Sequence, residues 1–199
     1  MRIIIGMRLF ALIIIALMIA GCVGKKSMPS WYRVDPDSHQ YTGKLGFTAD
    51  LPAGWMAYED MASRSLLLTR HSTPMDFIHI KRFALSVPQP LRHTELMFNA
   101  SMRTYELAEI AVFNLRATPG IFDLIVEELA PGEVDGREAF RLMMSYAMEN
   151  GIRRRCMVYG FVSGNSHYNE IGLYALEDYY FGAVYDDFAA LVGSFKVRK

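Results

Sequence analysis

Cysteine is scarce in this chain, which contains only Cys22 and Cys156. Small secreted domains without a sufficient hydrophobic core usually rely on several disulfides, and two cysteines cannot supply such a framework. We expect Cys22 to be modified, so that Cys156 has no partner for an intramolecular disulfide. A free cysteine is usually a small buried hydrophobic residue, and we favour this interpretation for Cys156.

An excess of charge of one sign is also missing. The chain holds 21 basic and 21 acidic residues, so its formal net charge is zero. Domains that bind nucleic acid usually carry a basic excess. We therefore expect no nucleic-acid partner.

Motifs for catalysis and for metal binding are absent as well. A pair of histidines one helical turn apart is a common metal-binding signature. No such pair occurs among the five histidines, which are His39, His71, His79, His93 and His167. A nucleophile pair of Cys156 and His167 is unfavourable, because a predicted hairpin separates the two by about 20 Å at ~3.3 Å per residue. A metal site whose ligands are distant in the sequence and meet only in the folded protein remains an alternative. We expect no enzyme activity, no resident metal and no cofactor.

Long hydrophobic runs are confined to the start of the chain. Arg2 and Arg8 precede an apolar run from Leu9 to Ala20. A basic region, an apolar segment of roughly 7–15 residues and a small-residue cleavage site are typical of a secretory signal. The stretch before Lys25 is shorter than the about 20 residues that cross a bilayer, so an uncleaved membrane anchor is the weaker interpretation, as is simple secretion.

The end of this run, Ile19-Ala20-Gly21 before Cys22, resembles the lipobox of bacterial lipoproteins. The resemblance implies that Cys22 becomes the mature N-terminus and carries acyl chains, which would anchor the protein stably to a membrane. Val23 and Gly24 do not match the aspartate associated with retention in the inner membrane. By analogy we expect a lipid anchor in the outer membrane, with the protein facing the periplasm.

The rest of the chain is predicted to form a linker and one domain. Residues 22–42 are largely polar, contain Pro29 and Pro36, and show no sustained periodicity. Whether the aromatic residues of this stretch dock on the domain or lie at the membrane interface stays open. We predict a signal peptide over residues 1–21, the lipidated cysteine and a flexible linker over 22–42, and a single α+β domain over 43–199.

Within this domain the hydrophobic pattern predicts strands and two helices. Period-two alternation and turn signals predict strands at residues 45–51, 65–69, 77–85, 121–129, 137–148, 152–163 and 167–175. Helical spacing predicts one helix within residues 91–116, with Thr94 as N-cap and an end before Asn114, and a second helix over 177–192. Turns are expected at Pro131-Gly132, Asp135-Gly136 and Asn150-Gly151.

The order of these elements resembles the PsbP-like and DcrB-like superfamily. The resemblance is carried by the strand Phe47 to Pro52 leading into Gly54-Trp55, by Val134-Asp135-Gly136-Arg137-Glu138-Ala139, and by the ending Ser194-Phe195-Lys196. It implies a curved antiparallel β-sheet flanked by helices, in an α/β/α sandwich. Members of this superfamily mostly act as accessory or interaction modules without a shared active site, so no catalytic residue is carried over.

Two sets of residues are candidates for contacts. Arg153 and Arg155 can share one face of a strand, where they would bind an anion or an acidic partner or would only be solvated. Tyr168 and Tyr174 could belong to an aromatic contact surface or could pack the sheet against its helix.

These observations support two functional hypotheses. The leading one is a lipid-anchored accessory protein of the cell envelope that binds another envelope protein and is not catalytic. The alternative is a carrier of a small molecule or lipid, or an unrecognised hydrolase, that uses a cleft between sheet and helix. This alternative predicts a pocket with several converging polar groups.

Overall fold

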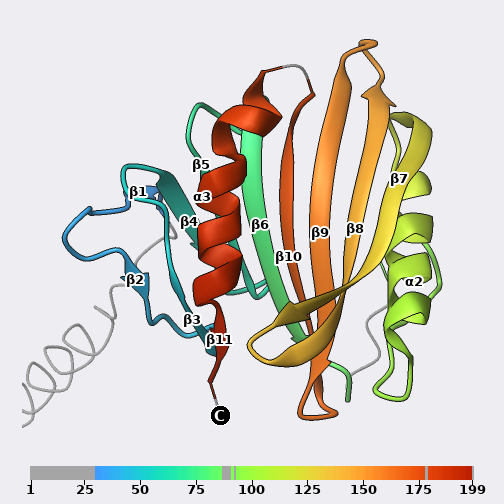
Figure 1. Ribbon diagram of the computed structural model, residues 1–199, viewed down its shortest axis with the longest axis horizontal. Coiled ribbons are helices and arrows are strands. Elements are labelled where there is room, and N and C mark those ends of the chain that lie inside the picture. Colours follow the sequence, from blue (N-terminus) through green and yellow to red (C-terminus); the bar gives the residue numbers. More distant parts are fainter. Residues whose placement is uncertain (1–29, 87–90, 92, 178, 199) are drawn as a thin grey trace, which may run out of the picture. The chain divides into compact units, whose positions relative to one another are not determined.

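The computed structural model describes residues 30–86, 91, 93–177 and 179–198 (Figure 1). Its main element is a sheet of eight strands in which each neighbouring pair is antiparallel. In spatial order the strands are β1 (Tyr32–Arg33), β4 (Met56–Asp60), β5 (Ser65–Thr69), β6 (Asp76–Ala84), β10 (His167–Leu176), β9 (Arg153–Ser163), β8 (Arg137–Met148) and β7 (Ile121–Val134).

The two faces of this sheet are covered by different elements. A small sheet of β11 (Lys196–Val197), β3 (Phe47–Asp50) and β2 (Gln40–Tyr41) covers one face together with α3 (Tyr180–Ser194). The other face carries α2 (Thr104–Arg116), which packs against β7, β8 and β9 (Figure 1). The predicted α+β class, an antiparallel sheet flanked by helices, is therefore confirmed.

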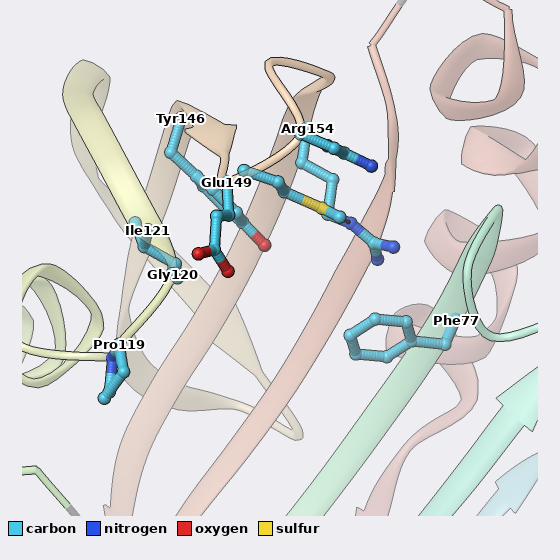
Figure 2. A pocket seen from close by; sticks show the side chains of 9 residues that line it. Phe77, Pro119, Gly120, Ile121, Tyr146, Glu149 and Arg154 are labelled. Carbon is cyan, nitrogen blue, oxygen red and sulfur yellow. Dashed lines mark hydrogen bonds between the residues drawn. The ribbon is translucent and has the colours of Figure 1, made fainter.

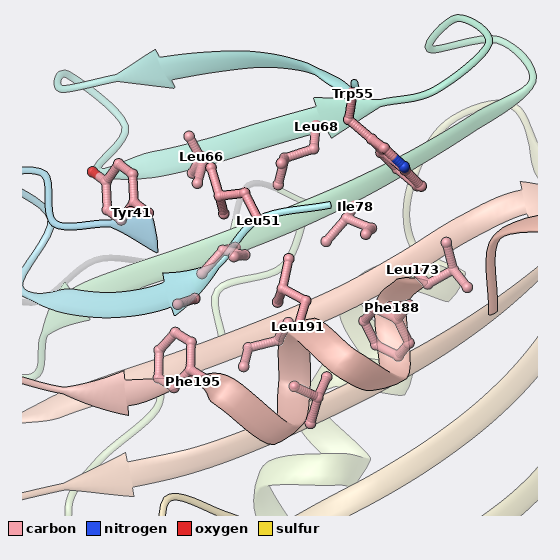
Figure 3. Close-up of a cluster of buried hydrophobic side chains, with 14 of the residues drawn as sticks. Tyr41, Leu51, Trp55, Leu66, Leu68, Ile78, Leu173, Phe188, Leu191 and Phe195 are labelled. Atoms are coloured by element: carbon pink, nitrogen blue, oxygen red, sulfur yellow. The ribbon is translucent and has the colours of Figure 1, made fainter. Parts of the chain in front are cut away.

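The larger hydrophobic core lies on the α3 side of the sheet. Figure 3 shows side chains of the sheet, such as Ile78 and Leu173, meeting Phe188 and Leu191 of α3. The helical spacing of apolar residues predicts a core-facing stripe on this helix: Phe181, Val184, Phe188, Leu191 and Val192 are buried, as predicted, whereas Tyr185 is only partly buried. The helix begins at Tyr180, later than the predicted residue 177.

The first predicted helix is shorter than expected. It begins at Thr104 rather than near Thr94, and it extends to Arg116 instead of ending before Asn114. The backbone N–H of Arg103 donates to the Glu106 carboxylate at 2.7 Å, which caps the start of α2. Before it, the side chain of Asn99 accepts a hydrogen bond from the backbone N–H of Ser101 at 3.0 Å. Local turns of this kind compete with helix formation.

The turns of the sheet were only partly predicted. Asp135 and Gly136 have φ values of 54° and 69° and join β7 to β8 in a two-residue turn, as expected. The turn predicted at Pro131-Gly132 is wrong, because both residues continue β7 opposite β8. Proline is tolerated there because β7 is an edge strand. The β8–β9 hairpin is present, but β8 ends at Met148 and β9 begins at Arg153, so its loop is longer than two residues.

The folded unit begins earlier than the predicted boundary at residue 43. The compact unit starts at Trp31, and the described part of the expected linker contains β1 and β2. Val34 and Tyr41 are buried, and the Trp31 ring lies 5.4 Å from that of Tyr58. Trp31 and Tyr41 therefore dock on the domain.

The predicted signal peptide and Cys22 lie outside the described residues. In the described part of the chain, no helix is long and apolar enough to cross a membrane.

Candidate functional site

A cleft of about 500 Å³ lies between the sheet and α2, and we call it the α2 cleft. Its floor includes Phe77 of β6 and Tyr174 of β10, whose stacked rings have centroids 4.8 Å apart. Ala111 and Leu115 of α2 and Ile121 of β7 form part of its wall. The cleft has the size and the largely apolar lining of many small-molecule sites.

Strand alternation explains why charged side chains reach this cleft. Ile78 and Ile80 of β6 are fully buried on the α3 side of the sheet. Their neighbours His79 and Lys81 therefore point to the opposite face, where they line the cleft. The same alternation on β10 places Glu170 there, directly opposite Lys81 in the β6–β10 pairing.

The charges at the cleft floor are mutually paired. Lys81 Nζ donates to Glu170 Oε1 at 2.8 Å, and the hydroxyl of Tyr168 donates to Glu170 Oε2 at 3.1 Å. Burial alone would raise the pKa of Glu170, but the charge of Lys81 and these hydrogen bonds outweigh it and hold that pKa low. Glu170 is therefore ionised at neutral pH, and Lys81 balances its negative charge.

His79 is a partly buried, neutral histidine beside this pair. Burial, followed by the charge of Lys81, lowers its pKa to about 4, although Glu170 and Asp60 act in the opposite direction. A histidine with so low a pKa carries no charge at neutral pH. The histidine therefore adds a hydrogen-bonding group, but no charge, to the lining of the cleft.

Cys156 lies under the cleft rather than in it. It is fully buried, and burial raises the pKa of its thiol to about 12, so that it stays protonated at neutral pH. It pairs with Tyr174 of β10, whereas His167 pairs with Ser163 near the other end of the hairpin. The prediction that the cysteine and this histidine do not form a nucleophile pair is confirmed.

The arginine run Arg153-Arg154-Arg155 of β9 is divided between the two faces of the sheet. Arg153 and Arg155 share one face, as alternation predicted, and they pair with Glu177 at 3.2 Å and with Glu127 at 2.9 Å. Arg155 also lies over the Phe181 ring of α3 at 5.7 Å. Neither of these two arginines lines the α2 cleft. The middle residue Arg154, which the sequence did not single out, points to the α2 side.

The two candidate tyrosines have different environments. Tyr168 is fully buried, and its ring stacks on that of Phe98 with centroids 3.8 Å apart. It therefore packs the sheet against the segment that precedes α2 and offers no contact surface. Tyr174 is half-buried and faces the cleft.

Next to the cleft lies a second, more open hollow of about 710 Å³, which we call the Arg154 hollow (Figure 2). Figure 2 shows Arg154 and Phe77 on one side, Tyr146 and Glu149 in the middle, and the turn Pro119 to Ile121 on the other side. Phe77, Ile121 and Tyr146 line both spaces. The hollow and the α2 cleft therefore adjoin one another.

No group of three or more His, Cys, Asp or Glu side chains that could hold a metal ion occurs within the described residues.

Comparison with known proteins confirms the fold and leaves the function open. No family model and no curated protein sequence matches the chain. A protein from Bacteroides thetaiotaomicron gives a TM-score of 0.52 with 12% identity over 81% of this chain and 48% of its own. This chain thus spans about half the length of that protein.

Cyanobacterial PsbP (CyanoP) from Synechocystis sp. PCC 6803 gives a TM-score of 0.50 with 14% identity over 87% of this chain and 96% of its own. LpqN, a protein of Mycobacterium tuberculosis involved in cell envelope biogenesis, gives 0.41 with 14% identity over 89% and 88%. The likeness to CyanoP shows that the chain has a PsbP-like fold, as its element order predicted. These likenesses do not assign a role to the α2 cleft.

Proposed function

We propose that this protein is a non-catalytic binding protein of the cell envelope, tethered to a membrane through lipid on Cys22, and that it holds a small apolar or amphiphilic molecule in the α2 cleft. The observation that carries this proposal is the cleft itself. It is about 500 Å³ in volume, it lies between the sheet and α2, and several polar groups converge on its floor.

The state of these polar groups favours binding over catalysis. Lys81 and Glu170 neutralise each other at 2.8 Å, and a general acid or base needs a pKa near the working pH. The pKa of Glu170 is held low and that of His79 is about 4. The thiol of Cys156 is protonated and fully buried. These groups can orient a ligand, but they are poorly suited to proton transfer or nucleophilic attack at neutral pH.

Blocking the cleft tests this proposal. Ala111→Phe places a bulky ring in the α2 wall, and Ala190→Phe makes the same change on the exposed side of α3. Mass spectrometry of small molecules that copurify with the full-length protein should detect a ligand in the wild type and in Ala190→Phe, and its loss in Ala111→Phe. Equal small-molecule content in all three proteins would contradict the proposal.

The membrane tether is supported by the lipobox-like sequence before Cys22. Intact mass should report acyl chains on this cysteine, and globomycin should block maturation. Cys22→Ser should lose the lipid mass and move the protein out of the membrane fraction. An unlipidated mature chain from a bacterium that processes lipoproteins would refute this part of the proposal.

A second candidate function, binding of another envelope protein, is favoured by the exposed side chains of β7. Phe122 and Ile125 are each about half exposed on this edge strand, at 54% and 53%, and they share one face of it because they pair with Ala147 and Ser145 of β8. Exposed apolar patches of this kind often mark interaction sites. Crosslinking in cells followed by affinity capture should return a specific partner that Ile125→Glu loses. Ile152→Glu, at an exposed position in the β8–β9 loop, is the matched control and should retain that partner.

A further inference from the structure

Arg154 is a buried arginine without a carboxylate partner. Its exposed fraction is 5%, and no Asp or Glu among the described residues forms an ion pair with it. Burying a charged side chain is costly unless the charge is paired. The neighbouring Arg153 and Arg155 follow this rule, because each has a glutamate partner.

The contacts that Arg154 does make leave its charge uncompensated. Its Nη2 donates to the carbonyl of Pro74 at 2.6 Å and its Nε lies 3.2 Å from the sulfur of Met148. The guanidinium lies over the Phe77 ring at 5.3 Å. These neutral partners hold the side chain in place, which fixes the position of a full positive charge.

One edge of the guanidinium is free to bind. Among the described residues no hydrogen-bond acceptor pairs with Nη1, and the side chain contributes to the lining of the Arg154 hollow. Arg154 lines the hollow of Figure 2, where the carboxylate-bearing residue Glu149 is exposed to solvent. Guanidinium groups bind carboxylates and phosphates through paired, charge-assisted hydrogen bonds. The hollow thus offers preplaced donors for an anion.

The adjoining α2 cleft supplies the apolar complement. Apolar and aromatic side chains dominate its lining, and its own charges are neutralised within the Lys81–Glu170 pair. A molecule that spans both spaces would therefore place its apolar part in the cleft and its negative group at Arg154.

We propose that Arg154 recognises the anionic group of an amphiphile whose hydrocarbon part occupies the α2 cleft, so that the ligand is a carboxylate or phosphate monoester with an alkyl chain. This inference rests on the proposed function and assigns a ligand class to the same site. Arg154 is in this view the residue that sets the polarity and orientation of the bound molecule.

Photocrosslinking of the full-length protein in neutral lipid vesicles tests the inference. The probes are a diazirine-bearing fatty acid, the matching alkyl phosphate and the matching fatty alcohol, and the readout is the labelling of cleft peptides by mass spectrometry. Both anionic probes, or one of them, should label at lower concentration than the alcohol. Labelling by the phosphate alone or by the acid alone identifies which anion the site takes.

Variants separate recognition of the anion from binding in general. Arg154→Met should weaken labelling by the anionic probe about 10- to 100-fold and leave labelling by the alcohol unchanged, which also shows that the variant is folded. Glu149→Gln removes an exposed negative charge from the same hollow and should strengthen anionic labelling about twofold. Because Glu149 is exposed, this second variant remains informative if Arg154→Met does not fold.

The outcomes distinguish this inference from the proposed function. Equal labelling of the cleft by the acid, the phosphate and the alcohol, with no effect of Arg154→Met or Glu149→Gln, would overturn the role of Arg154 and leave the binding function standing. No labelling of cleft peptides by any probe would overturn both.

Discussion

Loss of His79 should remove a large part of the acid sensitivity of this protein. Burial and the charge of Lys81 lower the pKa of His79 from 6.5 to about 4 in the folded state. The unfolded chain therefore binds a proton between these two values that the folded protein does not. By linkage this contribution to stability is fully present above the unfolded pKa of 6.5 and is lost as the pH falls from there towards the folded pKa.

The size of the effect follows from the two pKa values. When the pH is lowered from about 8 to about 5, the titration of this single histidine should reduce the free energy of unfolding by about 2 kcal/mol. His79→Gln keeps a hydrogen-bonding side chain but cannot titrate. The free energy of unfolding of the wild type, minus that of His79→Gln, should therefore be about 2 kcal/mol smaller at about pH 5 than at about pH 8.

Urea unfolding followed by tryptophan and tyrosine fluorescence measures both free energies. The comparison with the variant cancels the titration of other groups as long as they respond equally in both proteins. His39→Gln makes the same change at an exposed position and is the control for the loss of a histidine. If the difference between wild type and His79→Gln is the same at both pH values, the burial argument for this histidine is refuted.

The remaining predictions concern stability and use the same unfolding assay. Lys81→Met leaves Glu170 buried without a cation, and breaking a fully buried pair costs about 3–5 kcal/mol of unfolding free energy. Because 34% of the Lys81 side chain is exposed, we expect a smaller loss of about 2 kcal/mol. No loss of stability would show that the pair is not formed. Asp76→Ala removes a fully buried carboxylate that accepts backbone hydrogen bonds at 2.8 and 3.3 Å and should cost about 3 kcal/mol, so a near-neutral result would contradict this role. Phe188→Ala opens a cavity in the core on the α3 side and should cost about 3–5 kcal/mol, whereas Tyr179→Ala, at a position that is 69% exposed, should stay within about 0.5 kcal/mol.

The sequence predicted the elements whose pattern is local. In β8 the alternation of apolar residues matches the observed strand at both ends, Arg137 and Met148, and the apolar stripe of α3 is buried as expected. The beginning of α2 was missed because apolar residues such as Met97 fit a helical spacing although they do not lie in a helix. Periodicity cannot separate these cases when a nearby loop residue, here Phe98, packs into the core.

The α2 cleft could not be predicted because its polar groups are brought together by long-range pairing. Lys81 and Glu170 are 89 residues apart in the chain and meet only because β6 lies next to β10 rather than next to β7, the strand that follows it in the chain. The polar alternation of β6 was visible in the sequence, where His79 and Lys81 alternate with Ile78 and Ile80. It indicated a face that is not part of the apolar core, but it did not indicate which helix or strand would cover that face.

The arginine run Arg153-Arg154-Arg155 shows that strand alternation predicts the face on which a side chain lies but not its counter-ion. Alternation predicted that Arg153 and Arg155 share a face, which the structure confirms, and the structure places Arg154 on the opposite face. It could not say which of the faces contains counter-ions, because Glu177 and Glu127 approach from a different loop and a different strand. An arginine with a glutamate partner is already neutralised, so the residue of such a run that can attract an anion is the one left without a partner. That residue is fixed by the register of neighbouring strands and by the position of α2, which the periodicity of a single strand does not contain.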